Sequence, residues 1–152
     1  MKISFFEEFP TKRNLSKLSL IDFPTKLYLA ASSFDDFLRL KNKIIGQDKK
    51  ITIKEFIYWP ILTKREGYWI SPFTKRKALL RIFDELKNTK TSIMLDLELP
   101  TTKNTSLYVT QFFNFLRNKY LIKKFIKNYP KKIYLAEYFP VGPLKRRLLQ
   151  SI

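Results

Sequence analysis

The sequence predicts an α/β protein that forms part of a (β/α)8 TIM barrel, and three observations lead to this fold class. Short apolar, strand-like runs alternate with amphipathic helical segments along the 152 residues, as in parallel sheets with right-handed crossovers. No glycine-rich loop follows the first strand, where doubly wound nucleotide-binding folds carry their phosphate cradle. Four apolar runs end at or near a proline, and three of these ends carry glutamate. Acidic residues at strand ends are typical of barrels, whose chemistry lies at the C-terminal ends of the strands.

Five strands are expected, and the helices between them follow from apolar residues at helical spacing. The strands cover about residues 2–6, 26–31, 53–59, 92–97 and 132–138. The helical segments cover about 11–18, 33–46, 74–86 and 105–128, the last as two blocks, and a short final helix follows Gly142 and Pro143. Ser33, with Asp36 three residues later, has the pattern of a capping box at the start of the second helix.

The chain is shorter than a whole barrel. A complete eight-stranded barrel takes about 250 residues, so this chain supplies about five of the eight strands. We interpret residues 1–152 as a single α/β domain, either the N-terminal portion of a longer barrel or a half-barrel that pairs with itself or with a complementary half. A small open doubly wound parallel sheet is the alternative.

An incomplete barrel leaves two sheet edges and an apolar inner face without cover. We therefore expect the chain to be unstable alone or dimeric. Phe6, Leu29, Ile57 and Leu135 are predicted to be among the residues that lose packing partners.

The composition excludes several classes of chemistry within this chain. It contains no cysteine and no histidine, so disulfides, thiolate or imidazole metal sites and Ser-His-Asp catalysis are all ruled out. Acid–base chemistry can come only from Asp, Glu, Lys or Tyr. No signal-peptide pattern opens the sequence, and no apolar stretch approaches the roughly 18 residues of a membrane span. We therefore expect a cytoplasmic protein.

The net charge of +17 indicates a polyanion as one partner to consider. Most of the 30 basic residues are lysines, however, and they are spread over every predicted helix. Arginine is the usual reader of phosphate and guanine. Biased codon usage explains the excess of lysine equally well, so nucleic acid stays an open partner that is not the favoured one.

Two resemblances add to this interpretation. The segments 6–10, 58–62, 67–73 and 94–100 resemble an uncharacterised family of archaeal TIM-barrel proteins, and the likeness covers nearly the whole chain and continues in that family beyond Ile152. It implies the fold and an archaeal source, without an activity. The segment 95–98, which contains Asp96 and Glu98, resembles the end of the strand-4 Asp-x-Glu signature of chitinase-type glycosidases, whose glutamate is the general acid. The first aspartate and the glycine of that longer signature are missing here, with Ile93 and Met94 in their region.

The strongest candidate site is a group of strand-end carboxylates. Asp96 and Glu98 are two residues apart on a strand and therefore share a face, whereas the leucines at 95, 97 and 99 form the face toward the helices. The two acids are thus predicted to point into the barrel. Glu137 ends the next strand, roughly 5 Å away in the sheet direction. At the end of the first strand we prefer Glu8 to Glu7, because residues 8–10 mirror residues 98–100.

Carboxylates packed together in a partly dry pocket raise at least one of their pKa values. An un-ionised acid beside an ionised one is the arrangement that glycosidases use. The same oxygen atoms are also suited to Mg²⁺ or Mn²⁺ as a cofactor. A purely structural role, in which the acids pair with some of the basic residues, is the third interpretation.

The loop over 63–72 is the second candidate site, because it follows the third strand at the same end of the sheet. Tyr68 and Trp69 offer aromatic faces that suit sugar rings or bases, and Lys64 and Arg65 suit phosphate or carboxylate groups. Trp59 is expected in the core or in the pocket wall. The alternative is a loop that its aromatic residues simply fix to the top of the barrel.

Three functions remain open from the sequence. The first is a hydrolase that acts on a glycosidic bond through Glu98 and a second acid. The second is a metal-dependent phosphodiesterase-like barrel that uses the acids as ligands. The third is not enzymatic: a basic polyanion-binding protein or a truncated, inactive half-barrel.

Overall fold

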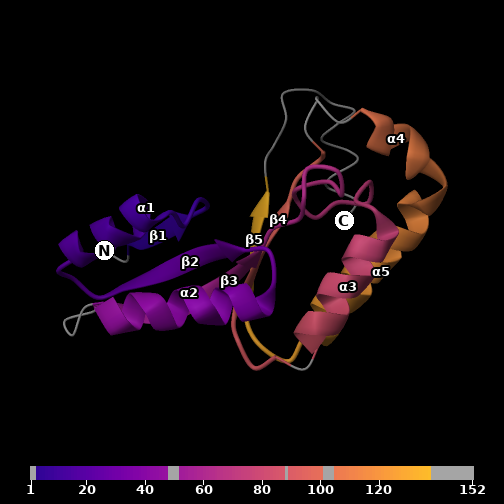
Figure 1. Ribbon diagram of the computed structural model, residues 1–152. Helices are drawn as coiled ribbons and strands as arrows, with labels where there is room; N and C mark the ends of the chain where they lie inside the picture. Colours follow the sequence, from indigo (N-terminus) through magenta and orange to yellow (C-terminus); the bar gives the residue numbers. More distant parts are fainter. Residues whose placement is uncertain (1–2, 48–51, 88, 101–104, 138–152) are drawn as a thin grey trace.

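Five parallel strands form one sheet in the order of the sequence. The computed structural model describes residues 3–47, 52–87, 89–100 and 105–137. The strands are β1 (Ser4–Glu7), β2 (Thr25–Ala31), β3 (Ile53–Pro60), β4 (Ile93–Leu97) and β5 (Ile133–Glu137), and each pairs in parallel with the next (Figure 1). The predicted α/β class with five parallel strands is confirmed. The observed strand ends lie within two residues of the predicted ones.

The helices also follow the predicted order. They are α1 (Lys12–Ser16) with the 3-10 turn η1 (Lys17–Leu20), α2 (Phe34–Gln47), α3 (Arg76–Lys87), α4 (Ser106–Thr110), the 3-10 turn η3 (Phe112–Asn114) and α5 (Phe115–Asn128). Ser33 Oγ accepts a hydrogen bond from the Asp36 amide (3.1 Å), which caps α2 as expected. The short helix predicted after Gly142 and Pro143 lies outside the described residues. None of the helices that the structure describes is long and apolar enough to cross a membrane.

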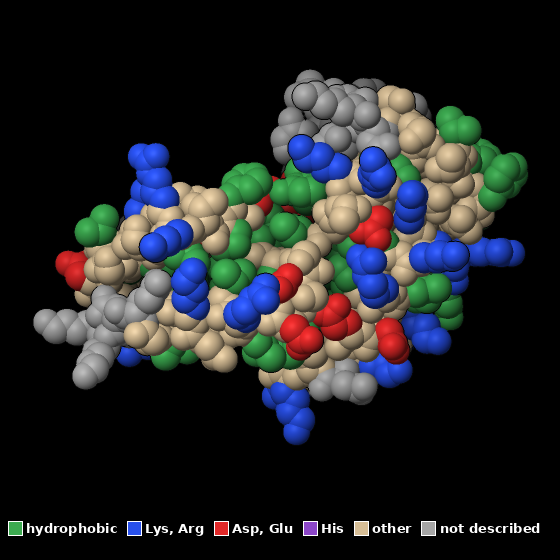
Figure 2. Space-filling model, in the orientation of Figure 1, with side chains coloured by type: hydrophobic (Ala, Val, Ile, Leu, Met, Phe, Trp, Pro, Cys, Tyr) green, Lys and Arg blue, Asp and Glu red, His purple; other side chains and the backbone are tan. Residues whose placement is uncertain are grey.

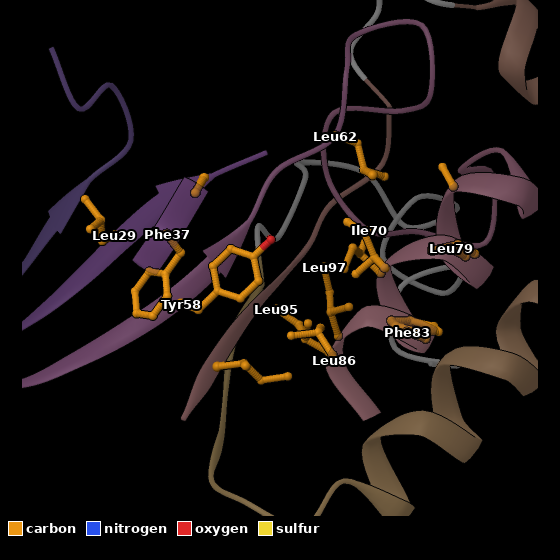
Figure 3. Close-up of a cluster of buried hydrophobic side chains, with 14 of the residues drawn as sticks. Leu29, Phe37, Tyr58, Leu62, Ile70, Leu79, Phe83, Leu86, Leu95 and Leu97 are labelled. Carbon is orange, nitrogen blue, oxygen red and sulfur yellow. The ribbon is translucent and has the colours of Figure 1, made fainter. Parts of the chain in front are cut away.

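The convex side of the sheet carries the larger hydrophobic core, and the helices cover it. Alternate residues of β2, β3 and β4 point to this side, because side chains along a strand alternate between its faces. Figure 3 shows the Tyr58 ring beside Phe37 of α2, and Leu95 and Leu97 directed toward the side on which Leu86 of α3 lies. The helix α2 lies along β2 and β3, while α3 and α5 pack against each other beyond β4 (Figure 1).

The concave side, called the inner face below, carries a smaller cluster whose buried members all come from the strands: Tyr28, Ala30, Ile57, Trp59 and Met94. The sheet curls strongly around this face. Lys26 Nζ in β2 donates a hydrogen bond to the Tyr134 hydroxyl in β5 (2.8 Å), although two strands lie between them in the sheet. A sequential strand order with the covering helices on one side matches a barrel segment, whereas a doubly wound sheet reverses its strand order and carries helices on both faces.

The expected loss of packing partners is right for two of four residues and wrong for the other two. Leu29 and Ile57 are 0% exposed. They lie in the central strands β2 and β3, where neighbouring strands complete their surroundings on either face. Phe6 in β1 and Leu135 in β5 are 59% and 50% exposed. Among these four residues, therefore, only the two in the edge strands are incompletely packed.

Basic side chains are spread over the visible face of the molecule rather than collected in one patch, and acidic side chains lie among them (Figure 2). Exposed apolar side chains gather instead at the corner formed by α4 and η3, where Val109, Phe112 and Phe113 are 76%, 67% and 89% exposed. This distribution does not delineate a nucleic-acid groove on the face in view.

Candidate active site

Asp96 and Glu98 lie at the C-terminal end of β4. They continue the series of alternate residues that begins with Met94 on the inner face. Met94, two residues before Asp96, belongs to the inner cluster, whereas Leu95 and Leu97 belong to the core under the helices. Asp96 is only 7% exposed, and Glu98 is half-buried. As the sequence predicts, the two acids therefore lie on the face of the strand opposite to Leu95 and Leu97.

Glu8 reaches the same place from β1, and its neighbour Glu7 does not. The Glu7 carboxylate accepts hydrogen bonds from the Phe9 amide (2.9 Å) and the Asn14 side chain (3.3 Å). Glu8 instead accepts a hydrogen bond from the Tyr68 hydroxyl (2.8 Å) and acts electrostatically on Asp96 and Glu98. The structure thus brings together three carboxylates, Glu8, Asp96 and Glu98, at the end of the sheet where the strands finish. We call these three residues the acid cluster.

Burial and neighbouring acids raise the pKa of two members of the acid cluster. Burial, followed by repulsion from Glu98 and a hydrogen bond with it, raises the pKa of Asp96 to about 7, and Glu8 adds to this effect. Burial and the charge of Glu8 also raise the pKa of Glu98, although its hydrogen bond with Asp96 acts in the opposite direction. A hydrogen bond between two carboxyl groups requires one proton, so the pair titrates as a unit in which Asp96 is the donor and Glu98 the acceptor.

The loop after β3 covers this end of the sheet and has a well-defined backbone. The amide of Leu62 donates to the Tyr68 carbonyl (2.9 Å), and the amide of Tyr68 donates to the Thr63 carbonyl (3.1 Å). Gly67 has a φ of 133° and Tyr68 a φ of 63°, backbone angles that residues other than glycine rarely adopt. These bonds hold the Tyr68 backbone in place while its hydroxyl reaches Glu8.

Further contacts link the loop to the strands and to the helices. The Ile70 amide donates to the Asp96 carbonyl (3.0 Å), which attaches the loop directly to the strand of the acid cluster. The side-chain amide of Asn118, in α5, donates to the carbonyls of Pro72 and Thr74 (2.9 Å each). The sequence analysis missed Asn118. A polar residue on the buried face of an amphipathic helix is the signal that could have found it.

The predicted binding residues are placed unequally. Tyr68 contacts Glu8, and Trp69 lies edge-on to the Tyr68 ring with their centroids 5.1 Å apart. Trp59 lies on the inner face and is 7% exposed. Lys64 and Arg65 are exposed in the turn before Glu66, and their role toward a substrate stays a prediction.

Glu137 is the last residue of β5, the strand next to β4. It pairs with Leu97, whereas the partner of Asp96 is Ala136. The side chain of Glu137 lies outside the described part of the chain, so its proposed catalytic role stays a prediction. Within the described residues, no group of three or more acidic side chains is arranged to hold a metal ion. The suggested Mg²⁺ or Mn²⁺ site stays a prediction.

No known protein family, curated protein or solved structure matches this chain. The site is therefore interpreted from its own geometry. Its defining features are three carboxylates at one end of a curled parallel sheet, the raised pKa of two of them, and an aromatic loop above them.

Proposed function

We propose that the acid cluster catalyses hydrolysis of a glycosidic bond by general acid–base chemistry. The observation that carries this proposal is that the buried Asp96 and the half-buried Glu98 lie together at the end of β4, where burial and the charge of Glu8 raise the pKa of both acids. Cleavage of a glycosidic bond needs one carboxyl group that is protonated near neutral pH and a second that is ionised.

Each acid has a distinct role in this proposal. Glu98 is more exposed than Asp96 and lies further along the strand, so it delivers the proton to the leaving oxygen as the C–O bond breaks. Asp96 is buried behind it and supplies this proton to Glu98 through their shared hydrogen bond, because Asp96 is the donor of the pair before the reaction. Glu8, which Tyr68 holds by a hydrogen bond, acts as the second carboxylate, either as the base that activates water or as the nucleophile.

Turnover of soluble polysaccharides, whose leaving oxygen requires a proton, by the purified chain tests this proposal. Replacing Glu98 with Gln removes the proton donor and is expected to lower kcat by about 10²–10⁴-fold, the usual contribution of a general acid. Glu7→Gln is the matched control, because it makes the same chemical change next to Glu8 at a side chain held elsewhere. Equal activity of Glu98→Gln and wild type would remove the acid cluster from the mechanism.

The anomeric form of the first product, followed by NMR, reports the working separation of the two carboxyl groups. Retention corresponds to about 5 Å and inversion to roughly 6.5–9.5 Å. Turnover of bis(4-nitrophenyl) phosphate that depends on added Mg²⁺ or Mn²⁺, without turnover of any glycoside, would favour the metal-dependent alternative instead.

We also propose that a second copy of the chain or a complementary barrel half covers the two edge strands. The support is the contrast between the exposed Phe6 and Leu135 at the edges and the fully buried residues of β2 and β3. Sedimentation of the purified chain is expected to show a dimer or an unstable, poorly folded monomer. A stable, compact monomer would count against a covered edge.

A further inference from the structure

Two buried polar atoms on the inner face have no hydrogen-bond partner among the described residues. They are the indole nitrogen of Trp59, a donor, and one carboxyl oxygen of Asp96, Oδ1, an acceptor. Both side chains are only 7% exposed. An unpaired buried polar group destabilises the fold, and such groups are rare in folded proteins unless water or a ligand completes them.

The two atoms belong to one surface. Trp59 packs in the inner cluster with Met94, which precedes Asp96 by two residues on the same face of β4. Phe6 in β1 lies edge-on to Trp59 with centroids 6.5 Å apart, and it stacks on Tyr28 at 4.4 Å. Phe6 is 59% exposed, so an open aromatic surface lies on the face that carries the acid cluster.

The chemistry of this surface limits what it can bind. An anion could accept a hydrogen bond from Trp59, but it would meet the charges of the acid cluster. A cation would be attracted to those carboxylates, but it has no acceptor for the Trp59 N–H. A neutral hydroxyl group both donates and accepts, so a molecule with several hydroxyl groups satisfies both buried atoms without adding charge.

We propose that the inner face binds a neutral sugar ring, with the Trp59 indole N–H donating to one hydroxyl group and Asp96 Oδ1 accepting from another. The exposed ring of Phe6 packs against the C–H groups of the sugar. This inference rests on the proposed glycosidase function and deepens it, because it names the substrate class and assigns Trp59 a recognition role beneath the carboxylates.

The test is an NMR titration of the indole N–H signals in Glu98→Gln, which keeps the surface and prevents turnover. The chain has two tryptophans, so the ¹H–¹⁵N spectrum has two indole signals, and the one that disappears in Trp59→Phe belongs to Trp59. Glucose, galactose, mannose and N-acetylglucosamine are each added to millimolar concentration. A saturable shift of the Trp59 signal with at least one of them is expected. The anionic analogue glucose 6-phosphate is expected to bind more weakly than glucose, because its charge meets the charges of the acid cluster.

Trp59→Phe keeps an aromatic ring and removes only the donor, so it is expected to weaken binding of the sugar about tenfold, in line with the loss of one hydrogen bond. Trp69→Phe assigns the two indole signals equally well, so the titration decides the question even if Trp59→Phe fails to fold. The inference is overturned if no neutral sugar moves the Trp59 signal, or if glucose 6-phosphate binds more tightly than glucose.

The two proposals fail in different ways. Turnover of a glycoside by the wild type without any shift of the Trp59 signal would overturn the binding role of this surface and leave the acid cluster as the catalyst. A saturable Trp59 shift without turnover of any glycoside would support the binding surface and remove the hydrolase.

Discussion

At the lower end of the inner face, where the strands begin, Lys26 and Glu55 form an ion pair of 2.6 Å. Lys26 also donates to the Tyr134 hydroxyl, and the Ser92 hydroxyl donates to Glu55 (2.7 Å). Burial acts to raise the pKa of Glu55, but these hydrogen bonds and the charge of Lys26 outweigh it and lower the pKa overall. At the upper end, where the strands finish, the acid cluster brings like charges together, and the pKa of both Asp96 and Glu98 is raised.

Acidic residues at the two ends of the inner face therefore have different surroundings, which shift their pKa values in opposite directions. Glu55 has a cation, Lys26, and a hydroxyl donor, Ser92, as partners. The acids at the upper end interact with one another instead. The sequence contains 30 basic residues, so a shortage of basic side chains does not explain the different surroundings of these acids. Acids that are held together at a cost to stability are typical of functional sites. The comparison therefore favours a structural role for the lower end and a chemical role for the upper end.

Asp96→Asn tests the upper end and has the largest expected effect on stability. The folded-state pKa of Asp96 is about 7, above its unfolded value, so the folded chain binds more protons and the Asp96 contribution falls as pH rises from about 4 to 7. Asparagine carries no such charge. Urea unfolding at pH 4 and pH 8 should show little difference between variant and wild type at pH 4, and a gain of a few kcal/mol for the variant at pH 8. A gain that is the same at both pH values would show that Asp96 is not protonated in the folded chain.

Gly67→Ala tests whether the loop over the upper end depends on its backbone geometry. An added Cβ would lie 3.0 Å from Thr74 Oγ1 and 3.2 Å from Thr74 Cα, at a φ of 133°. We expect a loss of about 1–3 kcal/mol in the free energy of unfolding, the usual cost of a backbone conformation that side chains rarely adopt. Gly46→Ala in α2 is the control, because nothing lies within 4 Å of its added Cβ, and it should leave stability unchanged or raise it. Equal effects of the two substitutions would argue that Gly67 is not strained.

Glu55→Gln tests the lower end. It removes the charge that faces Lys26 while leaving an oxygen for Ser92, and both partners of the ion pair are about one-third exposed. We expect a loss of at most about 1 kcal/mol, as for a solvent-screened pair, and this loss should shrink in high salt. The sign is opposite to that of Asp96→Asn at pH 8. A gain in stability would erase the contrast between the two ends.

Lys87→Gln sets the lower limit of the series. Lys87 pairs with Asp84 on the surface of α3, where the two side chains are 63% and 75% exposed. Thermal unfolding is expected to show no measurable change, because exposed pairs of this kind contribute little. A clear loss would mean that the surface charges of this protein carry more stability than the comparison assumes.

The sequence predicted the parts of this structure that depend on local pattern. Alternation along β4 places Asp96 and Glu98 on the inner face, and the repeated spacing before a proline favours Glu8 over Glu7. What it could not predict depends on curvature and on contacts distant in the chain. The bond from Lys26 to Tyr134 exists because the sheet curls, and no residue spacing encodes that curl.

The hydrogen-bond partners of single polar atoms could not be predicted from the sequence either. The unpaired nitrogen of Trp59 and the Asn118 anchor both depend on which side chains surround them in three dimensions. The burial of Leu29 and Ile57 shows the same limit from the other side. The expectation of an incomplete barrel did not distinguish the central strands, whose residues are buried, from the edge strands.

The hydrogen bond from the Ile70 amide to the Asp96 carbonyl has a practical consequence. Ile70 is fully buried, so its amide proton exchanges with solvent only when the loop separates from β4. Exchange at this one position therefore measures how often the loop opens above the acid cluster. The rate can be followed in the intact chain, before any substrate is known, and a ligand that binds beneath the loop would slow it.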